Sequence, residues 1–213
     1  MIEKGERIME NFNYKNYHVV GGPVVNLFRT PGAVYVTVRT GQGKSYRNYP
    51  KVVLLGDMRK EADGLKLGDR IEMECTIQSS RRENKNKPGK KIYSQDLIAF
   101  SLKRIPTVLE VAFGTEGGKP VDAKNYAELA GEVVHISKVA PNIVRLTLHT
   151  VIDGRNSYIS CSKFDYGKRD TTKKISKGDF VVAIGNTQTS KKEKEDGTRH
   201  FQTVMITYIK KVS

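Results

Sequence analysis

The sequence predicts an all-β protein with little helix, made of two copies of one small closed barrel in tandem. The first observation behind this prediction is an internal repeat. The segment NYHVVGGPVV from Asn16 returns as NYAELAGEVV from Asn125, at an offset of 109 residues. The segment LGDRIEMECTIQSSRRE from Leu67 aligns with KGDFVVAIGNTQTSKKE from Lys177, at an offset of 110. A nearly constant offset indicates that the chain contains the same fold twice.

The second observation is an alternation of apolar and polar residues, with the period of two that is typical of a strand buried on one face. It is clearest over residues 71–77 (IEMECTI) and recurs over residues 34–38 and 144–148. We also expect one short helix over residues 55–65, with Asp57 as its cap. About five strands and a helix in each repeat suit an OB-fold barrel, in which closure removes the exposed sheet edges.

The repeat divides the chain into an N-terminal leader (1–15), a first barrel (16–105), a linker (106–124) and a second barrel (125–213). The linker contains two prolines and three glycines, which disfavour regular structure. It also contains an apolar run, residues 108–113. We therefore expect a partly ordered linker that packs on a barrel.

The positive charge of the chain lies in the two repeats. Lys and Arg total 37 against 23 Asp and Glu, which gives a net charge of +14. Residues 16–105 hold 17 basic and 8 acidic side chains, and residues 125–212 hold 15 and 9. A surface this basic attracts polyanions, so nucleic acid is the expected partner.

The sequence argues against several other classes of protein. No apolar run approaches the roughly 20 residues that span a bilayer, and no signal-peptide core is visible, so we expect no membrane association and a cytoplasmic location. Cys75 and Cys161 lie far apart without neighbouring histidines, so we expect no disulfide, metal or other cofactor. The carboxylates are scattered and the histidines show no catalytic spacing, which disfavours an enzyme, a metal-dependent nuclease included.

Each repeat contains a basic hairpin arm. Residues 81–91 (RRENKNKPGKK) hold six basic side chains and one acid around a Pro-Gly turn, and residues 191–199 (KKEKEDGTR) hold four and three. Long basic side chains on such an arm contact phosphates without demanding a base sequence. The alternative interpretation is a solvated tip that keeps the protein soluble. The candidate phosphate-binding residues are Arg81, Arg82, Lys85, Lys87, Lys90, Lys91, Lys191, Lys192 and Arg199.

In each repeat, one stretch interleaves aromatic residues with basic ones. Unpaired bases expose flat faces that an aromatic ring can cover, and duplex DNA hides those faces. Tyr93 and Phe201 are expected at matching positions where each arm returns to its barrel. The other aromatic residues, Phe28, Phe100, Phe180 and Tyr208, are expected in the core. In the first repeat the candidates are Tyr46 and Tyr49 with Lys44, Arg47 and Lys51. In the second repeat the corresponding stretch contains Tyr158, Lys163 and Arg169, and the stacking role falls to Phe164 and Tyr166, with Lys168 beside them.

Three segments resemble the bacterial and phage single-stranded DNA-binding protein family, whose barrels are OB folds. They are NYHVVGGPVV from Asn16, YPKVVLLGDMRKEADGLKLGDRIEMECTIQSS from Tyr49 and IGNTQTSKKEKEDGTRHFQTVMIT from Ile184. The resemblance implies a stacking role for Tyr49, which stands where the family usually has a tryptophan. Leu55 stands where a stacking phenylalanine is common. Arg82 and Lys192 stand where the hairpin often has a tryptophan, so charge should contribute more than stacking.

The resemblance also implies a biological setting. The chain ends in YIKKVS, without the acidic tail through which cellular members of the family recruit other proteins. A phage or mobile-element version, acting in replication, recombination or transfer inside a bacterial cell or a phage-infected host, therefore fits better. Family members commonly assemble four OB folds, so a homodimer of this two-barrel chain is a further expectation.

The sequence thus predicts a protein that sequesters single-stranded DNA by neutralising phosphates and stacking on bases, with the first repeat as the stronger site. One alternative is an RNA-binding protein, since stacking and phosphate contacts do not exclude a 2′-hydroxyl. Another is a basic structural or assembly protein whose charged face docks an acidic protein partner.

Overall fold

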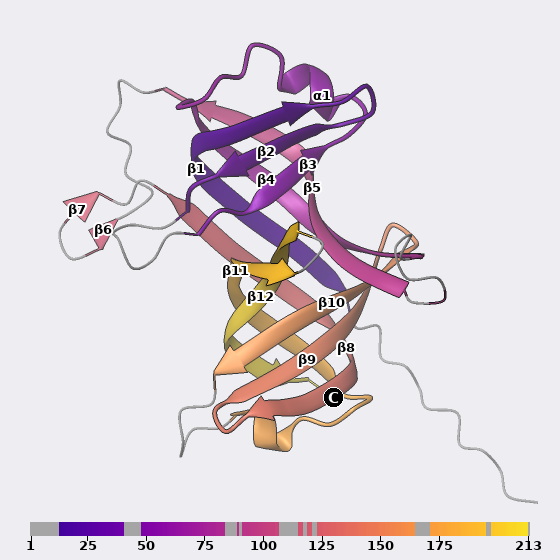
Figure 1. Ribbon diagram of the computed structural model, residues 1–213. Coiled ribbons are helices and arrows are strands. Elements are labelled where there is room, and N and C mark those ends of the chain that lie inside the picture. Colours follow the sequence, from indigo (N-terminus) through magenta and orange to yellow (C-terminus); the bar gives the residue numbers. More distant parts are fainter. Residues whose placement is uncertain are drawn as a thin grey trace, which may run out of the picture.

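The computed structural model is nearly all β, with two barrels that lie one above the other (Figure 1). The structure describes residues 13–40, 48–83, 89, 91–106, 115–116, 119–120, 123–164, 171–194 and 197–212. Within these ranges, some strand residues are described by their backbone alone: 82, 91–92, 115–116, 119–120, 191–194 and 197–200.

The first barrel is a closed ring of five strands in the order β1-β2-β3-β5-β4, with β4 pairing back to β1. All its pairs are antiparallel except β3 with β5. A helix between β3 and β4 completes the arrangement of an OB fold. The elements are β1 (Lys15–Arg29), β2 (Val34–Val38), β3 (Lys51–Leu54), α1 (Met58–Glu61), β4 (Arg70–Glu83) and β5 (Lys91–Ile105).

The second barrel repeats this topology in the order β8-β9-β10-β12-β11, with β11 pairing back to β8. The prediction of two tandem OB-fold barrels is therefore confirmed. Which segments fold independently, and hence the domain boundaries, stay a prediction. The elements are β8 (Lys124–Ala140), β9 (Ile143–Ile152), β10 (Arg155–Phe164), a 3₁₀ turn (Thr171–Lys174), β11 (Phe180–Lys194) and β12 (Gly197–Lys211), and the linker holds a small hairpin of β6 (Thr115–Glu116) and β7 (Lys119–Pro120).

The predicted helix is shorter than expected and is not capped as expected. It covers four residues, and Asp57 makes no capping hydrogen bond. Its carboxylate instead accepts a hydrogen bond from Lys60 Nζ at 3.0 Å. The residues that follow, Ala62 and Leu65, are buried in the core, so this segment packs against the barrel mainly through apolar contacts.

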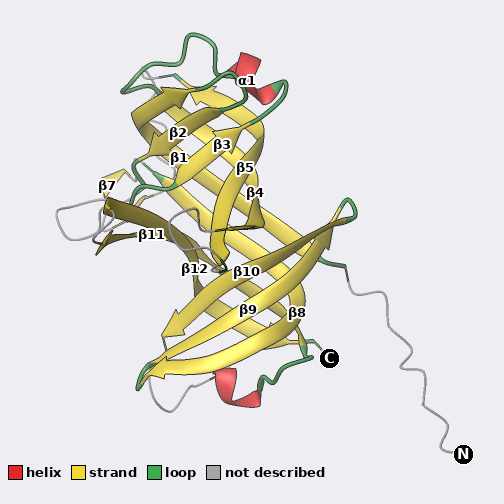
Figure 2. Cartoon of the chain, turned by 45° about the vertical axis from the view of Figure 1, so that its right-hand side comes forward, coloured by secondary structure: helices red, strands yellow, loops and turns green. Residues whose placement is uncertain are grey.

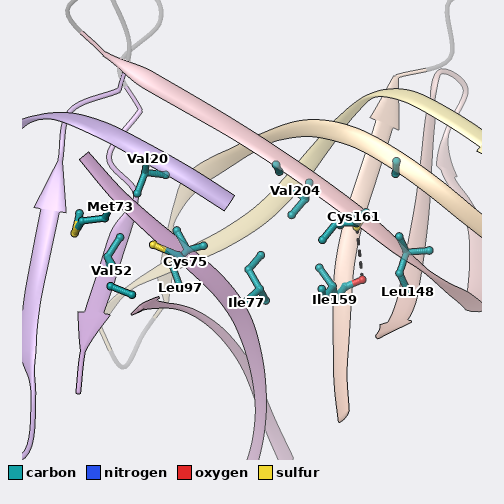
Figure 3. Packing of buried hydrophobic residues seen from close by; sticks show 14 of the residues in the cluster. Val20, Val52, Met73, Cys75, Ile77, Leu97, Leu148, Ile159, Cys161 and Val204 are labelled. Carbon is teal, nitrogen blue, oxygen red and sulfur yellow. Dashed lines mark hydrogen bonds between the residues drawn. The ribbon is translucent and has the colours of Figure 1, made fainter. Parts of the chain in front are cut away.

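The barrel interiors are filled by the apolar side of the predicted alternation. Ile71, Met73, Cys75 and Ile77 are all buried on β4, while the residues between them are partly exposed. Buried residues of both barrels belong to one apolar cluster, and Figure 3 shows part of it. Burial raises the pKa of both cysteine thiols, because the thiolate is the charged form. Among the described residues, no helix is long and apolar enough to cross a membrane.

Strands β1 and β8 join the two barrels into one continuous ten-stranded sheet (Figure 2). Residues 15–21 of β1 pair antiparallel with residues 124–130 of β8, and His18 faces Ala127. These two residues are also equivalent in the repeat, at the offset of 109. An antiparallel pair of equivalent strands relates the barrels by an approximate twofold axis, as in a symmetric dimer interface.

Two equivalent glycines, Gly22 of β1 and Gly131 of β8, directly follow the residues through which these strands pair with each other. A Cβ on Gly22 would lie 2.2 Å from the carbonyl oxygen of Arg39, and one on Gly131 would lie 2.3 Å from that of His149. No Cβ fits so close to a backbone carbonyl. Glycine at both positions lets Arg39, just after β2, or His149 of β9 cross tightly, so that the barrel closes.

Candidate nucleic-acid interface

Each barrel extends its β4–β5 or β11–β12 arm toward the other barrel. Ser79 on the first arm accepts a hydrogen bond at its Oγ from the backbone N–H of Tyr158 on β10, at 2.8 Å. The equivalent contact is present on the other side, where Thr189 Oγ1 accepts from the N–H of Tyr49 at 3.1 Å. Each arm therefore contacts the opposite barrel, which the sequence alone does not predict.

A second reciprocal contact involves two glutamines. Gln95 on β5 accepts a hydrogen bond from the N–H of Ser160, and Gln202 on β12 accepts one from the N–H of Lys51 at 2.8 Å. Gln95 Nε2 also donates to the carbonyl oxygen of Gln202 at 3.0 Å. Because each side chain bonds the backbone of the opposite barrel, the arms are held in place where they leave their own barrels.

The reciprocal contacts correct one sequence alignment. Tyr93 pairs with Arg81 across the first arm, and the equivalent pair in the second arm is His200 with Lys191. Phe201 instead pairs with Ser190, so its equivalent is Ser94. Since side chains alternate between the faces of a strand, Phe201 and Tyr93 lie on opposite faces, and the expectation that they match is wrong.

Tyr49 lies just before β3, on the outer face of the first barrel, and its side chain is 38% exposed. Backbone hydrogen bonds of Val38 and Thr40 to the residues around Tyr49 place it opposite Arg39. Lys51 follows on the same face and is exposed, with its ammonium 3.9 Å from the Asp96 carboxylate. The structure thus brings Tyr49 and Lys51 together as predicted and adds Arg39.

Tyr158 occupies the equivalent position in the second barrel and is 52% exposed. Its ring stacks on the His149 imidazole, with centroids 5.0 Å apart and planes 26° from parallel. His149 Nε2 in turn lies 2.7 Å from Asn156 Oδ1. From the sequence, Tyr158 is expected in this stretch, but the stacking role is assigned to its neighbours Phe164 and Tyr166. The offset of 109 from Tyr49 was the signal that identifies it.

The first arm presents a cation above an aromatic ring. The Arg81 guanidinium carbon lies 5.5 Å from the centroid of Tyr93, which is 66% exposed. Ser79, which bonds Tyr158, lies two residues before Arg81 and therefore on the same face of β4. The Arg81–Tyr93 pair of the first barrel therefore lies beside the contact between Ser79 and Tyr158 of the second barrel.

The remaining predicted site residues fall into three groups. Phe164 is partly buried at the end of β10, opposite Ile143, and Phe201 is 38% exposed on β12. Five residues have a described backbone only, at the arms: Arg82, Lys91, Lys191, Lys192 and Arg199. Eight lie outside the described residues: Lys44, Tyr46, Arg47, Lys85, Lys87, Lys90, Tyr166 and Lys168.

Three of the four aromatic residues expected in the core lie on the surface. Phe28, Phe100 and Tyr208 are 59%, 50% and 51% exposed, and only Phe180 is buried. The barrel interiors are filled mainly by Val, Leu, Ile and Ala side chains, whereas these three rings lie at exposed positions of their strands.

The outer face of the β1–β8 sheet has a different chemistry. The Tyr17 hydroxyl donates to Glu74 at 2.6 Å, and this hydrogen bond to the carboxylate raises the pKa of Tyr17 to about 12. Lys124 lies 3.3 Å from Glu72, and Lys15 lies 2.8 Å from Glu128. Aromatic and basic groups here are already paired with acids, so this face is less suited to a polyanion. In the described part of the chain, no cluster of His, Cys, Asp and Glu side chains could hold a metal ion.

The fold defines the chain as a tandem OB-fold protein. Neither a family model nor a curated protein sequence matches it. Among solved structures, it is similar to a deletion variant of the single-stranded DNA binding protein from Thermus aquaticus, with a TM-score of 0.69 and 17% identity over 94% of this chain and 96% of that one. The wild-type Thermus aquaticus protein gives a TM-score of 0.65 and 15% identity over 95% of both chains. These similarities establish the shared fold.

Proposed function

We propose that the chain binds single-stranded nucleic acid, DNA in the first place, without sequence preference and without catalysing a reaction. One observation carries the proposal. Tyr49 and Tyr158 are exposed at equivalent positions, and each hydrogen-bonds through its backbone to the arm of the opposite barrel. An exposed ring beside a basic hairpin offers a stacking surface for a base and a contact for its phosphate.

The similar solved structures support this proposal. Both are named as single-stranded DNA binding proteins, and their fold matches over nearly the whole of this chain. OB folds bind oligonucleotides through the face of strands 2 and 3 and the neighbouring loops, including the connection of strands 4 and 5. Tyr49 lies at the start of β3, and the arms are the β4–β5 and β11–β12 connections.

The proposal extends to setting and assembly. The resemblance of the arm and helix segments to phage and bacterial proteins supports a role in replication, recombination or transfer of a phage or mobile element, in the cytoplasm of a bacterial cell or infected host. Two chains would bring four OB folds together as a homodimer. Sedimentation at several protein concentrations, with and without oligonucleotide, tests the assembly.

The decisive experiment is fluorescence anisotropy of labelled oligo-dT, a matched duplex and oligo-U across a salt series. We expect tight binding to oligo-dT that persists at moderate salt, with the duplex at least about tenfold weaker, because only single strands expose base faces. Stronger binding to oligo-U would assign the site to RNA. Equal and steeply salt-sensitive binding to all three would contradict the proposal and favour a basic protein that docks an acidic partner.

A further inference from the structure

We propose that the first barrel holds a second base-stacking position, formed by Phe28 and Tyr35 on its outer face, and that the second barrel lacks it. This inference rests on the proposed binding of single strands and assigns an additional contact to it.

Phe28 and Tyr35 form an exposed aromatic pair. They face each other across β1 and β2, and their ring centroids are 6.0 Å apart with planes 38° from parallel. The Lys51 ammonium lies 5.5 Å from the centroid of Tyr35. Phe28 keeps 59% of its surface exposed, so the ring contributes little to the core. A grouped, exposed apolar surface beside a cation marks a binding site for a flat anionic partner.

The pair continues the face that contains Tyr49. Tyr35 and Arg39 point to the same side of the barrel, and Arg39 lies opposite Tyr49. Tyr35 and Arg39 are four positions apart along the strand, which is about 13 Å. Stacked bases of one strand are spaced by only about 3.4 Å. The pair would therefore hold a different base from the one at Tyr49, with Lys51 between them as a phosphate contact.

Tyr35 also has a structural role, and Phe28 does not share it. Tyr35 lies opposite Val53, which is only 5% exposed although it belongs to the outer face of β3. Covering Val53 accounts for a tyrosine at position 35. It does not account for an exposed phenylalanine at position 28, so Phe28 is the residue to test.

The second barrel supplies the control for this test. Its pairing places Ser137 opposite Arg145, and these residues are equivalent to Phe28 and Tyr35. Ser160 is equivalent to Lys51, because both precede the parallel pairing of their strand. A barrel of the same topology therefore forms with serine at this position. The substitution Phe28→Ser should leave the fold intact.

We expect Phe28→Ser to weaken binding of long oligo-dT by about fivefold to tenfold, as for the loss of one stacked base. The matched control is Phe100→Thr, which removes another exposed phenylalanine, 50% exposed against 59% for Phe28, and introduces the residue found at the equivalent position of the second barrel, Thr207. Phe100 packs near Tyr17 on the β1–β8 face, with centroids 6.3 Å apart, so its loss should leave binding unchanged. Thermal unfolding of both variants verifies the fold.

Crosslinking of the wild-type protein gives an independent readout. Ultraviolet crosslinking to 5-iodouracil in oligo-dT, followed by trypsin, should label peptides 16–29 and 30–39, which contain Phe28 and Tyr35. If Tyr49→Ala weakens binding while Phe28→Ser has no effect and neither peptide is labelled, the second stacking position is wrong and the proposed function stands. If Tyr49→Ala and Tyr158→Ala are also without effect, the proposed function itself fails.

Discussion

The two barrels share a side-chain contact at the start of β1 and β8, and they differ on their outer faces. Asn16 bonds the backbone N–H and carbonyl of Ile77 in the first barrel, and Asn125 bonds those of Thr187 in the second. The outer face of the first barrel carries Phe28, Tyr35, Arg39, Tyr49 and Lys51, whereas the same places in the second carry Ser137, Arg145, His149, Tyr158 and Ser160. The asparagine side-chain contacts to the backbone are the same in both barrels and stabilise the shared fold, whereas the solvent-facing positions differ. We therefore expect equivalent substitutions to act alike in the interior and differently on the surface.

The largest effect should come from the crossing glycines, and it should appear in both barrels. Gly22→Ala and Gly131→Ala each force a methyl group into a backbone carbonyl, and we expect each to lower the free energy of unfolding by about 3 kcal/mol. Chemical denaturation measures it. Gly32→Ala is the control, because a Cβ there meets nothing within 4 Å. A loss confined to one barrel's glycine would contradict the equivalence of the two crossings.

The next effect should separate the barrels. Tyr49→Ala is expected to weaken binding of oligo-dT by about 2 kcal/mol, and Tyr158→Ala by less, because the ring of Tyr158 already stacks on His149. Both variants should leave the salt dependence unchanged, since a ring neutralises no phosphate. Anisotropy titrations at three salt concentrations test this. Equal losses would mean that the two sites bind alike despite their different faces.

His18 breaks the internal symmetry, since its equivalent is Ala127. Burial lowers the pKa of His18 to about 3, whereas in the unfolded chain it titrates near 6.5. The unfolded state therefore gains a proton first as the pH falls, and this group alone should lower the free energy of unfolding by about 2 kcal/mol between neutral pH and pH 5. Carboxylates titrate mostly below this window. His18→Leu should flatten the pH dependence there, and an unchanged slope would exclude His18 as its cause.

The smallest effect should come from the first arm. Arg81→Gln removes one phosphate contact, so we expect a few-fold weaker binding and a salt slope flatter by about 0.7, the value for one phosphate on a single strand. Tyr93→Ala serves as the comparison, because it removes the ring under Arg81 and keeps the charge. If both variants flatten the slope equally, Tyr93 acts by positioning Arg81.

The fold was predictable because its signals are local. The alternation over Ile71, Met73, Cys75 and Ile77 is visible in any window of seven residues, and the repeat needs only an alignment of the chain with itself. The expected core positions of Phe28, Phe100 and Tyr208 were wrong because hydrophobicity does not tell the inside of a strand from the outside. Five-stranded barrels have narrow interiors, and shorter side chains fill them here.

The site was harder to predict, for reasons of register and assembly. The connection in the second arm is three residues shorter than in the first, so the offset between repeats falls from 110 on β11 to 107 on β12. A slip of one residue in that alignment put Phe201 on the wrong face. The contact between Ser79 and Tyr158 joins residues of different repeats, and it follows from the β1–β8 pairing, which no spacing within one repeat reveals.

Because each arm contacts the opposite barrel, cleavage of the chain between the barrels should have a predictable outcome. Within the described residues, the linker strands β6 and β7 pair only with each other, while β1, β8 and both arms carry the contacts between the halves. We therefore expect the peptide connection to act mainly as a tether, which keeps the local concentration of one half around the other high. A chain nicked between residues 106 and 123 should stay associated, which makes this segment a natural place for split-protein reconstitution or circular permutation.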